Sequence, residues 1–281
     1  MNDTKATDDI IECIAAMHIQ EQKTPRCNNY FQRTHAVDES SRTAMITWLC
    51  QISDALSLNR ETVGLATSFL DRFLSSQTKS AEQALNDRHK FQLAAITTFY
   101  IAVKINEPVL LRIDMLVKLC RNFYDQHVIL SMEKDILFSL EWRISSPTAL
   151  DFVRQALALL PSTESCDLEK AEQYVFSSIK DIHFSTIAPS MVGAACVALS
   201  LQESSISTSL DESMLWDRIF KTLELDRSTE FAIIQQRLRE KSSGSRKITN
   251  IGGRAITTLH KGSSYVNLGE ASSPVAINES V

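Results

Sequence analysis

Hydrophobic residues recur along most of this chain at spacings of three and four, which is the pattern of one apolar helix face. No segment shows the strict alternation expected of a half-buried strand. The first amphipathic segment, Asp8–Gln20, stands apart, because the following stretch, Lys23–Asp38, is irregular. Glycine (7) and proline (6) are scarce, as expected for a chain with few tight turns. We therefore predict an all-α protein.

The remaining helical segments fall into two sets of five. The first set comprises Asp38–Leu56, Glu61–Ser76, Phe91–Pro108, Asp114–Cys120 and Tyr124–Leu140, with a polar loop at Gln77–Arg88. The second comprises Thr148–Leu160, Leu168–Ile182, Pro189–Leu201, Glu212–Leu223 and Ser228–Arg239. In each set the third segment is the most apolar. A helix that is apolar all round is normally surrounded by its neighbours, so we predict two bundles, each built around its third helix.

These patterns divide the chain into four parts. Residues 1–37 hold the N-terminal helix and its irregular continuation, and residues 38–146 form the first five-helix repeat. Residues 147–240 form the second repeat, which begins at Pro147, a residue suited to a first helical turn. Residues 241–281 are rich in serine and glycine and lack periodicity, so we predict a disordered C-terminal tail.

Composition and charge exclude several classes of function. The net charge of −5 gives no support for nucleic-acid binding, and no apolar run reaches the roughly 18–20 residues of a membrane span. The acidic start, MNDTKATDDIIE, is unlike a signal peptide. The six cysteines lack metal-ligand spacing and favour buried, reduced thiols, so we expect a nuclear or cytoplasmic protein. No phosphate loop or catalytic motif is present, and we predict no catalytic residue, cofactor or metal.

Four charged residues stand inside apolar segments: Arg42, Asp71, Lys104 and Glu133. A buried charge without a partner is costly, so each should be compensated. Arg42 and Asp71 are expected to form an ion pair between the first two helices of the first repeat. Lys104 could pair with Glu107 along its own helix, extend to solvent, or donate to another molecule. Glu133 could equally be an ordinary solvated residue.

Five segments, in order, resemble motifs of the cyclin family. They are Ser41–Leu49 (SRTAMITWL), Val63–Ser76 (VGLATSFLDRFLSS), Phe91–Glu107 (FQLAAITTFYIAVKINE), Met132–Val153 (MEKDILFSLEWRISSPTALDFV) and Ile187–Leu201 (IAPSMVGAACVALSL). The resemblance implies two tandem five-helix cyclin folds after an N-terminal helix. It also implies no enzymatic activity, but binding and allosteric activation of a cyclin-dependent serine/threonine protein kinase in cell-cycle control. A cyclin-fold transcription factor, either a transcriptional cyclin or a TFIIB-like protein, is the alternative.

The resemblance also assigns roles to residues. Lys104 and Glu133 match the lysine and glutamate that hydrogen-bond the kinase, and Arg42 and Asp71 match an internal ion pair. Asn106 stands where many relatives have an acidic residue. Further kinase-facing positions are Ile105, Glu107, Leu137 and Ile144. Part of a shelf that could dock substrates of the kinase is retained at Met45, Trp48, Phe91 and Gln92. In the tail, Ser273 precedes a proline and is a candidate phosphorylation site.

Overall fold

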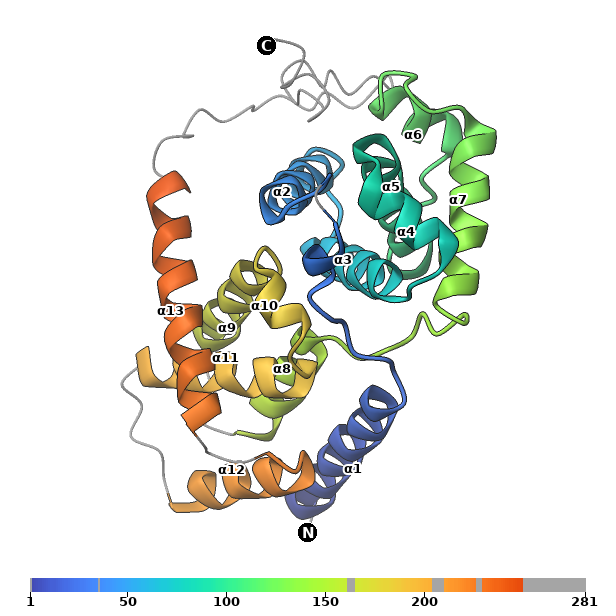
Figure 1. The fold of residues 1–281 in the computed structure, drawn as a ribbon. Coiled ribbons are helices and arrows are strands. Elements are labelled where there is room, and N and C mark those ends of the chain that lie inside the picture. The colour runs from blue at the N-terminus through green and yellow to red at the C-terminus, as the bar shows by residue number, and fades with distance from the viewer. Residues whose placement is uncertain (1, 35, 161–164, 204–209, 226–228, 250–281) are drawn as a thin grey trace, which may run out of the picture. The chain divides into compact units, whose positions relative to one another are not determined.

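The computed structural model describes residues 2–34, 36–160, 165–203, 210–225 and 229–249, and over these ranges the chain is helical with no strand (Figure 1). The predicted all-α class is therefore confirmed. No helix in these ranges combines the length and the apolar character needed to cross a membrane.

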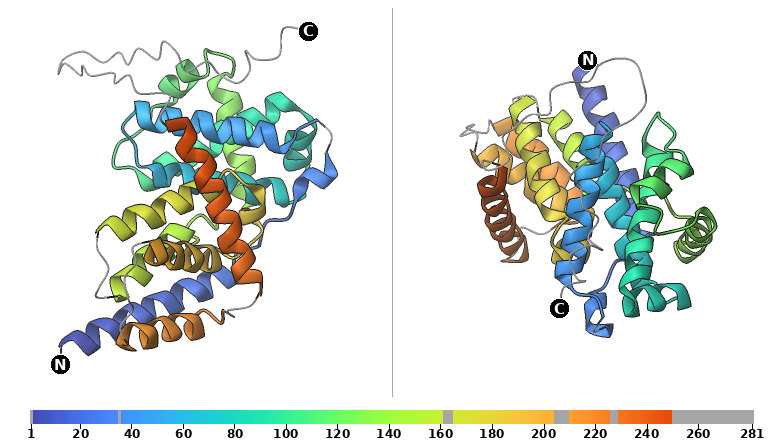
Figure 2. Two further views of the ribbon diagram at one scale, coloured as in Figure 1. Left: turned by 90° about the vertical axis from the view of Figure 1, so that its left-hand side faces the viewer. Right: turned by 90° about the horizontal axis from the view of Figure 1, so that it is seen from above.

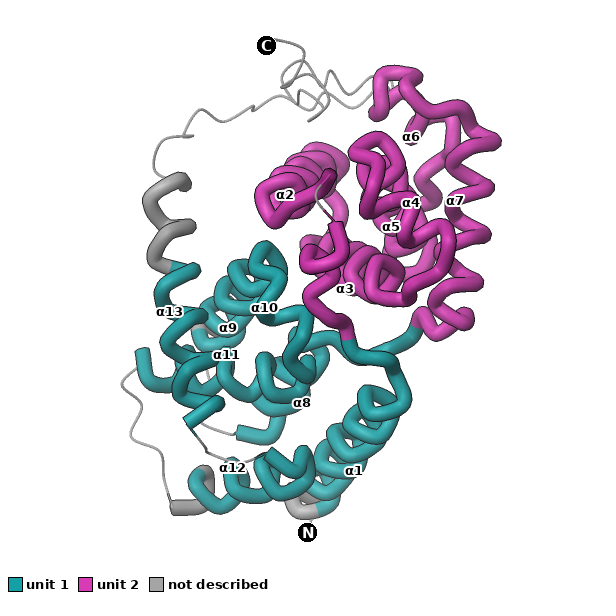
Figure 3. The backbone as a smooth tube through the Cα atoms, in the orientation of Figure 1, with its two compact units in different colours: residues 1–26, 145–249 teal, residues 27–144, 250–281 magenta. Residues whose placement is uncertain are grey.

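The chain divides into two compact units (Figure 3). Unit 2 contains residues 27–144 together with 250–281, and the latter lie outside the described residues. Unit 1 contains residues 1–26 and 145–249. The helices of unit 2 are η1 (Tyr30–Arg33), α2 (Glu39–Ala55), α3 (Arg60–Ser75), α4 (Lys79–Asn86), α5 (Arg88–Asn106), α6 (Ile113–Leu119) and α7 (Gln126–Ser139).

Helix α5 is the centre of unit 2. Every residue from Phe91 to Val103 is buried, and α5 packs against α2, α3, α4 and α7. Asp87 caps its first turn, because the carboxylate accepts the backbone N–H groups of His89 and Lys90 at 2.8 and 3.2 Å. The prediction of a central helix in the first repeat is thus confirmed, and Lys104 lies in the last turn of that helix.

The segment Gln77–Arg88 is largely helical, and its prediction as a polar loop was wrong. Thr78 occupies the N-cap of α4, and the buried side chains of Ala81, Ala84 and Leu85 form a narrow apolar face. Two of these three side chains are alanines, so the face is apolar without raising the hydrophobicity of the segment much. That small signal explains why the sequence pattern suggested a loop.

Unit 1 repeats the plan of unit 2. Its helices are α1 (Asn2–Gln22), α8 (Ala149–Leu159), α9 (Ser165–Ser178), α10 (Ile182–Ser185), α11 (Pro189–Glu203), α12 (Leu210–Thr222) and α13 (Thr229–Thr249). Helix α11 packs against α8, α9 and α13, and short α10 precedes it as α4 precedes α5. Gly193 allows a close approach, since a Cβ there would lie 2.7 Å from the Ala149 carbonyl oxygen.

Helix α1 does not stand apart but belongs to unit 1. It packs against α8, α11 and α12, and α1 and α12 lie side by side (Figures 1 and 2). Ile14 is buried in the core of this unit, with Ile10 and Ile11 packed against it. At the other end of α1, the buried Glu21 carboxylate accepts bonds of 2.7 Å from the Ser190 backbone N–H and from its hydroxyl. Glu21 therefore caps the first turn of the central helix α11.

The C-terminal helix is longer than the sequence pattern suggested. Helix α13 continues beyond Arg239 to Thr249, so the first residues assigned to the tail, from Lys241, are helical. Residues 250–281, the remainder of the predicted tail, lie outside the described residues, and so does Ser273. The change from unit 2 to unit 1 falls between Ile144 and Ser145.

Candidate functional site

Lys104 and Glu133 form an ion pair between α5 and α7 in unit 2. The two helices pack together, which brings the last turn of α5 beside the middle of α7. The Lys104 side chain is 34% exposed and that of Glu133 is 11% exposed. The ammonium group also lies 4.3 Å from the centre of the Tyr100 ring, a distance that permits a cation–π contact. The pair therefore lies at the surface of unit 2 with one side packed on an aromatic ring.

Burial, together with the negative charge of Glu133, raises the pKa of Tyr100 above its usual value. The phenol therefore stays neutral at physiological pH, and its ring faces the ammonium group of Lys104. The helical spacing of the sequence places Tyr100 on the same face as Lys104, one turn earlier, but gives it no role.

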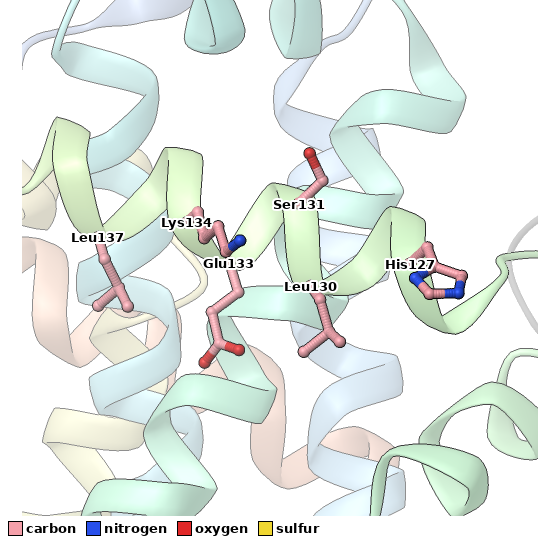
Figure 4. Close-up of a pocket in the computed structure, with 6 residues that line it drawn as sticks. All are labelled: His127, Leu130, Ser131, Glu133, Lys134 and Leu137. Carbon is pink, nitrogen blue, oxygen red and sulfur yellow. The ribbon is translucent and has the colours of Figure 1, made fainter.

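Glu133 belongs to a row of side chains along α7 that line a shallow pocket of about 470 Å³ (Figure 4). In Figure 4 the side chains of Leu130, Glu133 and Leu137 point to one side of α7. The other lining residues are His127, Ser131 and Lys134. The pocket thus combines apolar groups on both sides of Glu133 with the carboxylate itself, and a partner's backbone could meet both kinds of group there.

The other kinase-facing positions differ in exposure. Ile105, next to Lys104, is 43% exposed and is available to a partner. Leu137 and Ile144 are partly buried. Their role in binding another molecule stays a prediction.

Glu107 bonds to α3 rather than along its own helix. Its Oε1 accepts the backbone N–H of Asn59 at 2.8 Å and the hydroxyl of Thr62. Asn59 is the N-cap residue of α3, but its own side chain makes no capping bond there. Glu107 thus supplies the oxygen acceptor at the start of α3, and Asn106 supports it through a 3.0 Å bond to Thr62.

Arg42 and Asp71 form the expected ion pair, inside unit 2. Arg42 Nε donates to Asp71 Oδ1 at 2.8 Å and Nη2 donates to Oδ2 at 2.6 Å. The Tyr30 hydroxyl donates to Oδ1 at 2.7 Å. All three groups are almost completely buried. The Asp71 carboxylate and the Tyr30 hydroxyl therefore both have hydrogen-bond partners. Together the three residues link α2 and η1 to α3. Tyr30 was missed because nothing in the irregular stretch around it signals burial.

The four residues of the expected substrate-docking shelf lie inside unit 2. Met45, Trp48, Phe91 and Gln92 are all buried, with at most 6% of their surface exposed. A docking shelf would have to expose these side chains, which the helices α2 and α5 instead carry in buried positions. The Tyr124 hydroxyl lies 3.0 Å from Gln92 Oε1, so this amide oxygen is also engaged. Docking of substrates on these residues stays a prediction.

Two exposed aromatic residues follow Glu133 along the chain and were not singled out in the sequence. Phe138 is 69% exposed and Trp142 is 59% exposed, and their rings meet edge to face with centroids 6.2 Å apart. Large exposed aromatics are uncommon on a surface that contacts only water, and they are enriched in the cores of protein interfaces. They extend the apolar character of this end of α7.

The side chains that the structure describes contain no group of three histidine, cysteine, aspartate or glutamate residues able to hold a metal ion. Burial raises the pKa of the Cys27 and Cys120 thiols to about 12, so both are protonated at neutral pH. Such thiols are poor nucleophiles and poor metal ligands.

Comparison with known protein families identifies the part of the chain that holds this ion pair. The family model described as "Cyclin, N-terminal domain" matches residues 12–145, a range that contains α5, α7 and the pairs Lys104–Glu133 and Arg42–Asp71. The chain contains a cyclin domain. Lys104 and Glu133 thus lie within the matched cyclin domain, as the resemblance of the sequence motifs implied.

Two curated cyclins illustrate the relationship. The G2/mitotic-specific cyclin-2 of Antirrhinum majus is 30% identical over 201 residues, covering 70% of this chain and 43% of that protein. The G2/mitotic-specific cyclin-B2 of Oryzias latipes is 30% identical over 187 residues, covering 66% of this chain and 45% of that protein. This chain therefore matches less than half the length of either relative.

A solved structure supports the fold. The viral cyclin from herpesvirus saimiri superimposes with a TM-score of 0.65, covering 84% of this chain and 99% of that chain, at 16% sequence identity. At that identity the similarity is one of fold alone. It agrees with the two helical repeats found here.

Proposed function

We propose that this protein is a regulatory subunit that binds a cyclin-dependent serine/threonine protein kinase and activates it allosterically in cell-cycle control. The observation that carries the proposal is the Lys104–Glu133 pair, held between α5 and α7 within the matched cyclin domain. Its relatives are named as G2/mitotic-specific cyclins, which favours a role in the cell cycle.

The chemistry of the pair suits recognition of another protein's backbone. A lysine ammonium has three donors, and Glu133 occupies one of them. A carboxylate has about four acceptor positions, so Glu133 can bond Lys104 and still accept from a partner. Because Glu133 is mostly buried and already paired, a partner would meet a carboxylate whose position is set in advance.

Apolar groups beside the pair would supply the rest of the binding energy. Ile105 is exposed next to Lys104, and Leu130 and Leu137 line the pocket on either side of Glu133. A small charged centre surrounded by apolar contacts that exclude water is the usual form of an interface hot spot. Activation would follow if this surface binds the active kinase conformation more tightly than the inactive one.

The chain itself is proposed to have no catalytic activity and to act where its kinase acts, in the nucleus, the cytoplasm or both. The direct test is binding and activation of a purified cyclin-dependent kinase, with Lys104→Ala, Glu133→Ala and the double variant compared with the unchanged chain. We expect the double variant to bind at least 100-fold more weakly while keeping its helical circular dichroism spectrum. Undiminished binding by that variant would remove the pair from the interface, and failure of the unchanged chain to bind any such kinase would overturn the proposed function.

A further inference from the structure

Arg72, in the last turn of α3, is a buried cation without a partner. The residue is only 7% exposed, and its Nη1 atom is buried with no hydrogen-bond acceptor. Among the described residues, no carboxylate forms an ion pair with Arg72. A buried guanidinium that lacks an acceptor is unfavourable. We therefore expect Arg72 to have a partner that this chain does not supply.

Two other arginines of unit 2 show how the same fold normally treats such groups. Arg42 is even more deeply buried, and Asp71 binds it through both carboxylate oxygens. Arg33 pairs with Glu82 and also donates to the Leu74 carbonyl oxygen at 2.5 Å. Arg42 Nη1 and Arg33 Nε are, like Arg72 Nη1, buried without an acceptor, but each of these two guanidinium groups has an acidic partner supplied by unit 2, which Arg72 lacks.

The charged and ionisable groups around Arg72 do not supply the missing negative charge. Burial, and the positive charge of Arg143, lower the pKa of Arg72 from its usual value. Cys27 also lies within electrostatic range, but burial raises the pKa of its thiol to about 12, so it is neutral at pH 7 and cannot act as the counter-charge. The negative end of the α3 dipole favours a cation there but offsets only a fraction of the cost of desolvation.

We propose that Arg72, together with Arg143, is a receptor for an oxyanion, a phosphate or carboxylate group, brought by a molecule other than this chain. The planar guanidinium of Arg72 matches two oxygens of such a group, whereas a monatomic anion would satisfy its donors poorly. The side chain of Arg143 is 47% exposed and bridges to Glu141 at 3.0 Å, and its positive charge acts on Arg72. This site is additional to the Lys104–Glu133 pair and does not depend on it.

The test is thermal unfolding of the full chain at pH 7 and constant ionic strength in chloride, in inorganic phosphate and in acetate. An anion that binds only the folded chain raises the unfolding midpoint with its concentration, by about 3–5 °C at ten times its dissociation constant. We expect phosphate or acetate to raise the midpoint relative to chloride. Whichever is effective identifies the class of oxyanion, and the absence of any such rise in the unchanged chain would overturn the proposal.

Substitutions locate the effect. Arg72→Met keeps the length of the side chain but removes the charge, so we expect it to fold with an equal or higher midpoint in chloride and to lose the response to the oxyanion. Arg143→Gln, on the surface, should weaken the response several-fold. The matched control is Arg42→Met, which leaves Asp71 buried without its cation and should lower the midpoint sharply. If Arg72→Met lowers the midpoint as much as Arg42→Met does, Arg72 has a partner within the chain and the proposal is wrong.

Discussion

Lys104 on α5 pairs with Glu133 on α7, a residue 29 positions away, although Glu107 is only three positions along the same helix. The carboxylate of Glu107 instead bonds the start of α3. Two neighbouring charges at the end of one helix thus serve different purposes. Lys104 takes part in a surface pair that a partner can reach, and Glu107 secures the packing of α3 on α5.

Exchanging the charges of the surface pair separates stability from recognition. Lys104→Glu and Glu133→Lys should each place like charges side by side and lower the free energy of unfolding by about 1 kcal/mol, since the pair is partly exposed. The double variant restores an ion pair and should recover most of that loss in urea unfolding. It should still fail to bind the kinase, because donor and acceptor have changed places. Binding at the unchanged level would show that the pair only positions α5 against α7.

Glu107→Ala should destabilise the fold through α3. The change removes the acceptor of the Asn59 N–H and the Thr62 hydroxyl, and we expect the free energy of unfolding to fall by about 1–2 kcal/mol. Asp125→Ala is the control, because Asp125 occupies the N-cap of α7 but its side chain makes no capping bond, so its loss should change little. Urea unfolding compares the two variants, and equal midpoints would argue against a capping role for Glu107.

Two helical glycines should respond to alanine in opposite directions. Gly193→Ala places a Cβ 2.7 Å from the Ala149 carbonyl oxygen and 2.9 Å from the Phe152 Cβ, which should force α8 and α11 apart and cost about 1–3 kcal/mol. Gly64→Ala places a Cβ where nothing lies within 4 Å, and it should stabilise α3 by about 0.5–1 kcal/mol. Thermal unfolding of both variants is the measurement. A stabilised Gly193→Ala would show that α8 and α11 are not in such close contact.

Unit 1 should lose stability in acid through Asp181. Burial alone would raise the pKa of this carboxyl, but hydrogen bonds from Arg237, the His183 N–H and Lys241 hold the pKa at about 2. Because the folded pKa lies below the unfolded value of about 3.8, the stabilisation is complete above pH 4 and is lost as the pH falls towards 2.

Between pH 6 and pH 2.5 this loss amounts to about 1–2 kcal/mol. Asp181→Asn should be less stable than the unchanged chain at pH 6 and should lose correspondingly less on acidification, as measured by urea unfolding at both values. Asp114→Asn, at an exposed pair with Arg112, is the control and should leave the acid dependence as it was. An identical acid loss in Asp181→Asn and the unchanged chain would contradict this account.

Much of this protein could be predicted from its sequence because helical periodicity is a local property. The continuous apolar run Phe91–Val103 is sufficient to indicate a central helix, and α5 is that helix. The charged residues Arg42 and Asp71, placed in apolar segments, required compensation, and each was the obvious partner for the other. The cyclin motifs added the likeness that the matched domain at residues 12–145 confirms.

The tertiary structure decided which groups meet across helices. Only the packing of α5 on α7 selects Glu133 over Glu107 as the partner of Lys104, and only the folded structure shows that Met45 and Trp48 are buried. The assignment of α1 to unit 1 likewise follows from its packing on α8 and α12, with Ile14 in the core and the Glu21 carboxylate bonded to Ser190. The sequence by itself determined where the helices form and which charges need a partner, because both follow from local spacing and the cost of burial. The choice of each partner depends on contacts between distant segments, which the periodicity of the sequence does not record.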